Sequence, residues 1–317
     1  MSFPFRISLI VSIFAVGISL HTQNTLPAAD PENKETSSSK VLVTVNGQSV
    51  TQADLDFAYL SRGMVNAPET ARQQVLEGLI NQRLIEDFLA QQKITVPPQQ
   101  LDQSVLRIEK LIRKKGDAPE QILAKMGFTP EKLRAAIALP LSWNIYAKRE
   151  ITPAQMQTYF DAHREELDGT RVEASHILLK LPENANQESI QHTKQKLAAL
   201  RKQILAGTLT FTEAAAQHSV APSKNEGGKL VTSAYRGKTP VVLTEQIFPL
   251  KAGEISAPFQ SPFGVHIVTL NKKHPGQFSL EDIRGDIFKI LSQSLWKNTI
   301  QKLRGNAKIE WKTDSSN

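Results

Sequence analysis

Two histidines stand inside apolar, β-branched runs of this sequence, and imidazole is the side chain that most readily donates, accepts or transfers a proton near neutral pH. His266 lies in "GVHIVTL" and His176 lies in "RVEASHILLKL". In a strand, alternation would place His266 on the face opposite Val265 and Ile267. Two such imidazoles can act as an acid and a base, or they can shape and stiffen their surroundings through hydrogen bonds. We favour the second role and leave the first open.

Other routes to covalent or metal chemistry find little support. The chain contains no cysteine, which excludes disulfides, thiolate nucleophiles and thiolate zinc sites. Ser219 follows His218, but it lies in no G-x-S-x-G motif, and adjacent residues on one helix do not face each other. The remaining histidines lack the spacing of metal ligands; they are His21, His163, His192 and His274. We therefore predict neither a metal nor a cofactor.

Length and charge bound the class of protein. The chain has 317 residues, of which 40% are hydrophobic, and this is enough for two domains with packed cores. The formal net charge is +7, and the basic residues are spread among acidic ones. The short basic runs at 113–115 and 271–273 are typical of solvated surfaces, and no nucleic-acid-binding motif accompanies them. We therefore predict no nucleic acid partner.

The N-terminus has the pattern of an export signal. Arg6 is followed by an apolar stretch over 7–20, which is short for a membrane span and well suited to the core of a signal peptide. We predict a signal peptide at 1–29, no stable membrane span in the mature chain, and a location in the periplasm or cell envelope. An uncleaved membrane anchor is the alternative. The polar, Ser-rich stretch 30–40 then predicts a linker.

A helical module is predicted for residues 41–167. It opens with a β-branched run and a hairpin turn at Asn46-Gly47. Apolar residues then recur at three- and four-residue steps, and several segments begin with proline inside the first turn, as helices often do. The predicted helices cover 68–92, 98–115, 118–126, 129–149 and 152–167.

In the stretch 168–274 the sequence alternates between strand-like and helix-like segments, and this predicts a compact domain of mixed strands and helices. The predicted order is strand, helix, helix, strand, helix, strand, with a short strand at 229–232 and a short helix at 243–248. The last stretch, 275–317, predicts a long amphipathic helix followed by a strand. The apolar face of that helix needs a partner, which we expect to be the module at 41–167. The predicted fold class is α+β.

Several short motifs between residues 171 and 273 resemble the parvulin family of peptidyl-prolyl isomerases. They are "ASHILLK", "FTEAAAQHS", "GGKL", "FPLKAGEIS" and "SPFGVHIVTL", in the order and spacing of the family. The opening "VTVNGQSVTQADL" and the returning C-terminal helix are similar to the exported SurA and PrsA chaperones. The resemblance implies a small antiparallel-type sheet with surrounding helices, and unfolded or proline-containing polypeptides as partners.

The resemblance also implies a role for the histidines. In parvulins two histidines on adjacent central strands face each other in the floor of the site, and His176 and His266 match those positions. Ser219 matches the serine that ends a helix, and these three residues are the candidate catalytic residues. Rotation about a peptide bond breaks no covalent bond, and an enzyme needs only to stabilise the twisted amide. A thousandfold acceleration requires about 4 kcal/mol of such selective stabilisation.

The sequence departs from the family pattern on the proline-binding side. Val220 and Ala221 stand where the family often has an acidic residue and a Cys or Asp. The candidate substrate-binding residues are Thr239, Leu243, Phe248, Phe259 and Phe263. For Leu243, Phe259 and Phe263, packing in a core is an equally good interpretation. Two functions follow as hypotheses: an exported isomerase and folding chaperone, or a non-catalytic chaperone with a degenerate parvulin domain.

Overall fold

The computed structural model describes residues 40–64 and 69–312, so the predicted signal peptide at 1–29 and nearly all of the predicted linker at 30–40 lie outside the described residues. The first elements are β1 (Val41–Val45), β2 (Gln48–Thr51), α3 (Gln52–Ser61), α4 (Glu69–Gln91), α5 (Pro98–Lys114), α6 (Pro119–Lys125), α7 (Pro130–Glu150), α8 (Pro153–Ala162) and α9 (Arg164–Leu167). They are followed by β3 (Arg171–Leu179), α10 (Gln187–Leu205), α11 (Phe211–His218), the 3-10 helix η2 (Pro222–Glu226), β4 (Ser233–Ala234), α12 (Val241–Ile247), β5 (Phe259–Ser261), β6 (Gly264–His274), α13 (Leu280–Asn306) and β7 (Ile309–Trp311). No helix within the described ranges is long and apolar enough to cross a membrane.

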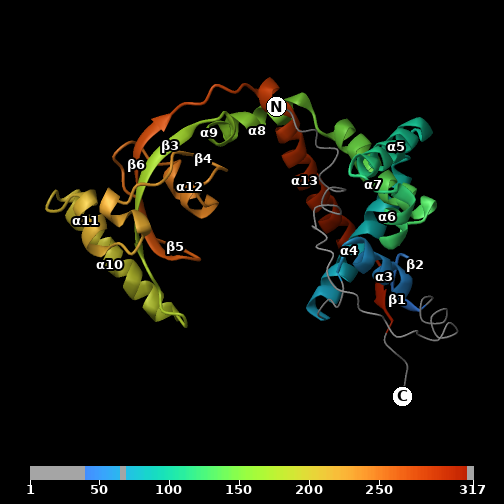
Figure 1. Cartoon of the computed structure of the whole chain (residues 1–317), viewed down its shortest axis with the longest axis horizontal. Coiled ribbons are helices and arrows are strands. Elements are labelled where there is room, and N and C mark those ends of the chain that lie inside the picture. The colour runs from blue at the N-terminus through green and yellow to red at the C-terminus, as the bar shows by residue number, and fades with distance from the viewer. Residues whose placement is uncertain (1–39, 65–68, 313–317) are drawn as a thin grey trace, which may run out of the picture. The chain divides into compact units, whose positions relative to one another are not determined.

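The chain divides into two compact units, whose elements are labelled in Figure 1. The first unit contains the residues up to Thr152 and those from Phe288 onward, and the second unit is Pro153–Ile287. The domain boundaries predicted from the sequence lie after residues 167 and 274. The two divisions therefore differ over α8, α9 and the start of α13, and the extent of the folding domains stays a prediction.

The sheet of the first unit brings β7 next to β1. The strand order is β2-β1-β7, and both neighbours of β1 run antiparallel to it. The predicted hairpin turn is confirmed, because Asn46 and Gly47 have φ values of +52° and +84°, as such a tight turn requires. Asn46 also fastens β7: its N–H donates to the Lys308 carbonyl, and its Oδ1 accepts the Lys308 N–H.

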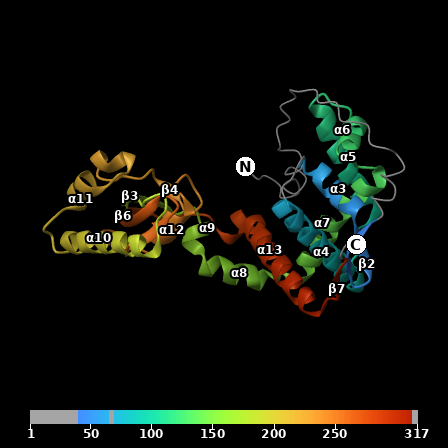
Figure 2. The ribbon, with the colours of Figure 1, turned by 90° about the horizontal axis from the view of Figure 1, so that it is seen from below.

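Aromatic and charged contacts hold α13 against α7 and α4, which lie beside it in both ribbon views (Figures 1 and 2). Trp143 of α7 meets Trp296 of α13 edge to face, with ring centroids 4.8 Å apart. The indole N–H of Trp143 donates to Ser292 Oγ at 3.0 Å, and Arg304 donates to the carboxylate of Glu77 on α4. The prediction that a C-terminal helix completes the N-terminal helical module is confirmed.

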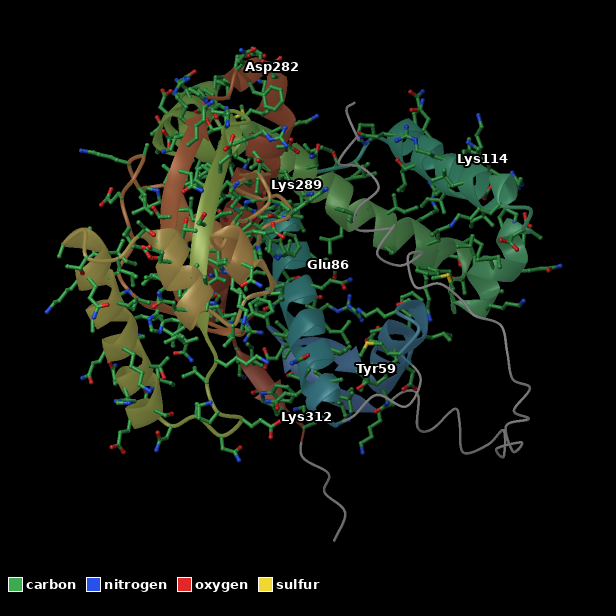
Figure 3. All side chains as sticks on the ribbon, turned by 60° about the vertical axis from the view of Figure 1, so that its left-hand side comes forward. Tyr59, Glu86, Lys114, Asp282, Lys289 and Lys312 are labelled. Atoms are coloured by element: carbon green, nitrogen blue, oxygen red, sulfur yellow. The ribbon has the colours of Figure 1, made fainter. Side chains whose placement is uncertain are left out.

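Helices α5, α6 and α7 form a separate core within the first unit. Ile108 and Ile112 of α5 are buried in one cluster with Leu133 and Ile137 of α7. Both pairs are four residues apart, which places them on one face of each helix. The opposite face of α5 is left to solvent, and Lys114, labelled in Figure 3, lies in its last turn.

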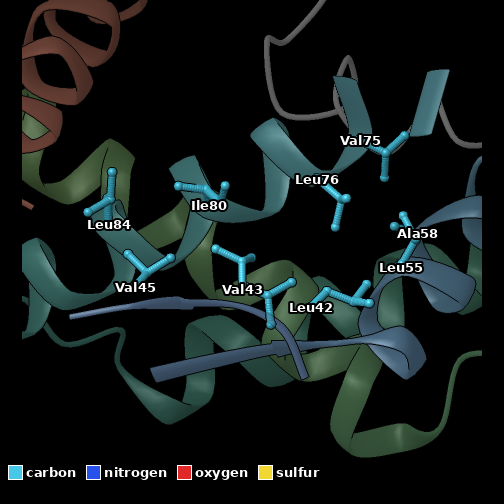
Figure 4. Close-up of a cluster of buried hydrophobic side chains, with 10 residues drawn as sticks. Leu42, Val43, Val45, Leu55, Ala58, Val75, Leu76, Ile80 and Leu84 are labelled. Carbon is cyan, nitrogen blue, oxygen red and sulfur yellow. The ribbon is translucent and has the colours of Figure 1, made fainter. Parts of the chain in front are cut away.

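The main core of the first unit lies between the sheet and helices α3 and α4. Val43 and Val45 of β1 lie across from Ile80 and Leu84 of α4 (Figure 4), and all four side chains are almost fully buried. Burying an aliphatic side chain of this size contributes about 1.5–3 kcal/mol. The inward-facing residues of β1, set by strand alternation, therefore pack against the apolar face of α4, set by the helical period.

Gly78 occupies an interior position of α4 where an added Cβ would find nothing within 4 Å. Glycine in a helix interior is unfavourable because its backbone loses more freedom on folding than that of alanine. Gly78→Ala is therefore expected to raise the free energy of unfolding of the first unit by about 0.5–1 kcal/mol. Urea denaturation followed by tryptophan fluorescence measures this, since all tryptophans belong to this unit: Trp143, Trp296 and Trp311. A decrease would contradict the expectation.

The second unit is built on an antiparallel sheet in the order β4-β3-β6-β5. On one face, Leu243 of α12 is buried with Val268. On the other face, Leu197 and Ala214 are buried with Ile267, and Figure 1 shows their helices α10 and α11 on the side of the sheet away from α12. The adjacent residues Ile267 and Val268 thus point to opposite faces, as strand alternation predicts. The predicted α+β class is confirmed.

Two local predictions are wrong. The helix expected at 152–167 is two helices, α8 and α9, because His163 between them has φ and ψ of −123° and 27°, which are not helical values. The strand expected at 229–232 forms only an isolated bridge between Lys229 and Ser175, and the regular strand β4 follows it at Ser233–Ala234.

Candidate active site

His176 and His266 lie on the two central strands of the second unit's sheet. Antiparallel pairing sets His176 opposite Val268 and His266 opposite Leu178. Because directly paired residues and alternate residues share a face, both histidines lie on the face of Val268, which α12 covers. Their rings stack with centroids 5.6 Å apart and an interplanar angle of 23°. The structure therefore brings together the two imidazoles that the sequence singled out, and their catalytic role stays a proposal.

A hydroxyl group and an aromatic ring contact His266. Ser261 Oγ lies 2.7 Å from His266 Nε2 and accepts the N–H of Phe263 at 3.0 Å. The hydroxyl proton of Ser261 is free to be donated to Nε2, in which case a neutral His266 carries its own proton on Nδ1. Phe259 stacks on His266 with centroids 5.4 Å apart and an interplanar angle of 17°. These contacts fix the plane of the imidazole.

Burial keeps the two imidazoles uncharged. His266 is 1% exposed, and desolvation lowers its pKa from 6.5 to about 4, with a smaller contribution from the neighbouring His176. Desolvation lowers the pKa of His176 as well. In each ring the Nδ1 atom is buried and has no hydrogen-bond partner among the residues that the structure describes. Both rings are therefore neutral at pH 7, and neither is a cationic acid.

Gly228 lets a second backbone segment approach β3 beside His176. The N–H of His176 donates to the Gly228 carbonyl at 2.8 Å, and the N–H of Leu230 donates to the Ala174 carbonyl. Gly228 has a φ of +73°, and a Cβ added to it would lie 2.2 Å from the His176 carbonyl oxygen. Glycine is therefore required at this position both by conformation and by close contact.

Gly228→Ala is expected to lower the free energy of unfolding of the second unit by roughly 3 kcal/mol or more, since steric overlap adds to the strain of a positive φ. Gly253→Ala is the matched control: Gly253 has a φ of +84°, but nothing lies within 4 Å of an added Cβ. The control should cost about 1–2 kcal/mol, which is the conformational strain alone. Urea unfolding followed by far-ultraviolet circular dichroism compares the two. Equal losses would contradict the steric argument.

Ser219 lies at the end of α11, where the backbone uses its hydroxyl. Its Oγ accepts the N–H of Leu178 at 3.1 Å and the N–H of Ala221 at 3.2 Å. The N–H of Val220 in turn donates to the Leu178 carbonyl. Ser219 thereby fastens the loop after α11 to the edge of β3. These contacts favour a supporting role, and a catalytic role for Ser219 stays a prediction.

Three candidate substrate-binding residues are buried within the second unit. Leu243 and Phe248 are buried in the core between α12 and the sheet. Thr239 is also buried, and its N–H donates to Ser233 Oγ. Their surroundings favour packing that supports the sheet face, and a direct contact with substrate stays a prediction for each of them.

Phe259 and Phe263 lie on the hairpin that carries His266. Phe259 pairs directly with His266 across the hairpin and packs, partly buried, against the core on the α12 side. Phe263 is 58% exposed in the turn. We call His176, His266, Ser261 and Phe259 the histidine cluster. Within the described part of the chain, no group of three or more His, Asp or Glu side chains could hold a metal ion.

Two protein families match successive parts of the chain. The SurA-like N-terminal domain matches residues 6–144, and the PPIC-type PPIase domain matches residues 176–272. The second match begins at His176 and includes His266. The chain combines a SurA-like N-terminal domain with a PPIC-type PPIase domain. The resemblance inferred from the short motifs is confirmed in both parts.

Curated relatives named Chaperone SurA match most of the chain. The protein of Alkalilimnicola ehrlichii is 28% identical over 276 residues, which cover 82% of this chain and 63% of the relative. The protein of Methylobacillus flagellatus is 26% identical over 256 residues, which cover 76% of this chain and 58% of the relative. This chain therefore spans about three fifths of the length of the curated relatives that it matches.

Solved structures of peptidylprolyl isomerases named PrsA are also similar. The structure from Bacillus anthracis is 24% identical and has a TM-score of 0.45, covering 74% of this chain and 99% of its own. The structure from Bacillus cereus is 21% identical and has a TM-score of 0.46, covering 88% of this chain and 96% of its own. The fold described above therefore depends on the helices and strands of this chain alone.

Ser261 and Phe259, two members of the histidine cluster in the PPIase domain, contact His266 in ways that were not predicted. No role was predicted for Ser261, and Phe259 was expected to bind substrate and not to stack on His266. The signal was present, because a turn at Pro262-Phe263 pairs position 259 with 266 and position 261 with 264. Alternation then places Ser261 and Phe259 on the same face as His266.

Proposed function

We propose that this chain is an exported peptidyl-prolyl isomerase that also acts as a folding chaperone on unfolded, proline-containing polypeptides. The PPIase domain supports the first activity, and the SurA-like domain supports the second. The apolar segment 7–20 supports export to the periplasm or cell envelope. The observation that carries the catalytic part is the stack of two neutral imidazoles and Phe259 on one face of the sheet.

Rotation about an X-Pro bond requires no nucleophile. The barrier is about 18–20 kcal/mol, and the unaided reaction takes tens to hundreds of seconds. The twisted amide of the transition state has lost its resonance and is less polar than the planar amide, so surroundings poor in water favour it. An enzyme for this reaction therefore needs a rigid, weakly polar surface against which the prolyl ring and the amide are held.

The histidine cluster has the properties of such a surface. Neutral imidazoles keep the surroundings weakly polar, because a charged ring would have to bring water or a counter-ion with it. Phe259 is only partly buried, and an aromatic face of this kind packs well against a pyrrolidine ring. The cluster can thus favour the twisted form without acid–base chemistry.

The proposal is tested by an assay that contains no protease. The chain beginning at residue 30 is mixed with a proline-containing tetrapeptide, and cis-to-trans conversion is followed by fluorescence or by exchange in NMR spectra. We expect conversion well above the rate in buffer at a chain concentration far below that of the peptide. No acceleration by chain that circular dichroism shows to be folded would remove the catalytic part of the proposal.

A non-catalytic chaperone is the second candidate, and the loop after α11 favours it. Ala221 is buried and Val220 is exposed, and neither side chain has a polar atom that could meet the amide. In this case the chain would suppress the aggregation of a denatured client protein while proline rotation stays at the rate in buffer. Both assays on one preparation separate the two candidates.

A further inference from the structure

Helix α5 presents to solvent a face that combines leucines with cations. Leu106 and Leu111 are 61% and 43% exposed. Arg107, Lys110 and Lys114 are exposed beside them. At 100° per residue these five positions fall in one stripe along the helix, opposite the face that is buried in the core with α7. We call these five residues the α5 outer face.

The three cations of the α5 outer face have no carboxylate partner among residues 40–64 and 69–312. Carboxylates on α5 and the adjacent helix pair with other side chains: Asp102 with Arg134, and both Glu109 and Glu120 with Arg113. The face therefore carries uncompensated positive charge around two large apolar side chains. The α5 outer face therefore offers cations and apolar side chains on the same surface.

We propose that the α5 outer face binds the surface of an anionic phospholipid membrane. Clustered Lys and Arg side chains are attracted to anionic headgroups, and their apolar stems let leucines between them enter the interface. The mixture of cations and leucines on one helix face gives both attraction to phosphates and apolar area for insertion, which is the combination that interfacial helices use. The inference does not depend on isomerase activity.

Sedimentation with vesicles tests this proposal. The chain beginning at residue 30 retains every described residue and lacks the apolar segment 7–20, which could itself bind lipid. We expect it to sediment with vesicles of phosphatidylglycerol and phosphatidylcholine in equal parts, and not with phosphatidylcholine alone. Rising salt concentration should release it, because the attraction to the phosphates is screened.

Two triple variants with the same change in net charge locate the binding face. Arg107→Gln/Lys110→Gln/Lys114→Gln removes the cations of the α5 outer face and should weaken vesicle binding roughly a hundredfold. The control removes three exposed cations of the second unit, Lys196→Gln/Lys202→Gln/Lys224→Gln, and should bind as the unchanged chain does. All six residues are exposed, so both variants should keep their circular dichroism spectra.

Because the chain contains no cysteine, a single labelled cysteine can report on insertion at one position. Leu106→Cys carrying a polarity-sensitive fluorophore should shift to shorter wavelength on anionic vesicles. The control is Leu205→Cys, which is 58% exposed at the end of α10 and should not shift. This measurement keeps the proposal testable if the triple variant fails to fold.

Three results would overturn the proposal. The first is a folded chain that does not sediment with anionic vesicles. The second is an equal loss of binding in both triple variants, because net charge alone would then explain the binding. An equal spectral shift at both labelled positions counts in the same way, because the insertion would then not be specific to α5. The third is a chain that ignores vesicles but loses suppression of client aggregation in the α5 variant, because then the face binds polypeptide.

Discussion

A chain that ends at Ile287 is expected to lose the cooperative unfolding of its first unit while the second unit keeps its own transition. Residues 288–312 supply β7, one of the two partners of β1, and the part of α13 that contacts α7 through Trp296 and α4 through Arg304. Without them, the apolar faces of the first unit lose their cover, and helices without tertiary packing are marginal in water.

The tryptophans make this effect easy to follow. Trp143 is the only tryptophan left in the shortened chain, and it belongs to the first unit. Its fluorescence should change gradually over a broad range of urea, whereas a control chain ending at Lys312 should show one sharp transition. If the shortened chain shows an equally sharp transition at the same urea concentration, the C-terminal stretch is not part of the folding unit.

Acid is expected to destabilise the second unit. The pKa of His266 is about 4 in the folded chain against 6.5 for an exposed histidine. Below about pH 6.5 the unfolded chain therefore binds more protons than the folded one, and stability falls until the pH reaches the folded pKa. The loss from this residue is about 2 kcal/mol at pH 5 and about 3 kcal/mol in all. His176, whose pKa is lowered in the same direction, adds to the loss.

Urea unfolding of the second unit at about pH 7.5 and about pH 5 measures this loss by circular dichroism. The matched variant is His266→Gln, whose side chain is polar but uncharged at both pH values. It should be less stable than the unchanged chain at the higher pH and should lose much less stability on acidification. The same pH dependence in both chains would show that His266 is not the group that titrates.

Much of the secondary structure could be predicted because its signals are local. Pro98, Pro119 and Pro130 begin three helices where a missing backbone N–H costs nothing, and the Asn46-Gly47 turn follows from conformations that few residues adopt. The pairing of β7 with β1 joins distant parts of the chain, and no property of either strand specifies it. The break between α8 and α9 was missed because apolar periodicity continues across it.

The candidate site was only partly predictable for the same reason. Alternation placed His266 on the correct face, but the meeting with His176 depends on the register of β3 and β6. The resemblance to parvulins supplied that register. Local pattern could not separate Phe248, which is buried, from Phe263, which is exposed, because both are aromatic residues beside prolines and their burial depends on which elements cover them.

The central claim is that proline-containing peptides bind at the histidine cluster. NMR signals of the histidine ring protons test it directly while a proline peptide is added to the chain. The account predicts that the signals of His176 and His266 shift in proportion to bound peptide, whereas the signal of His192, which is exposed on α10, stays in place. Unchanged signals from His176 and His266 while the chain accelerates rotation of the same peptide would contradict it.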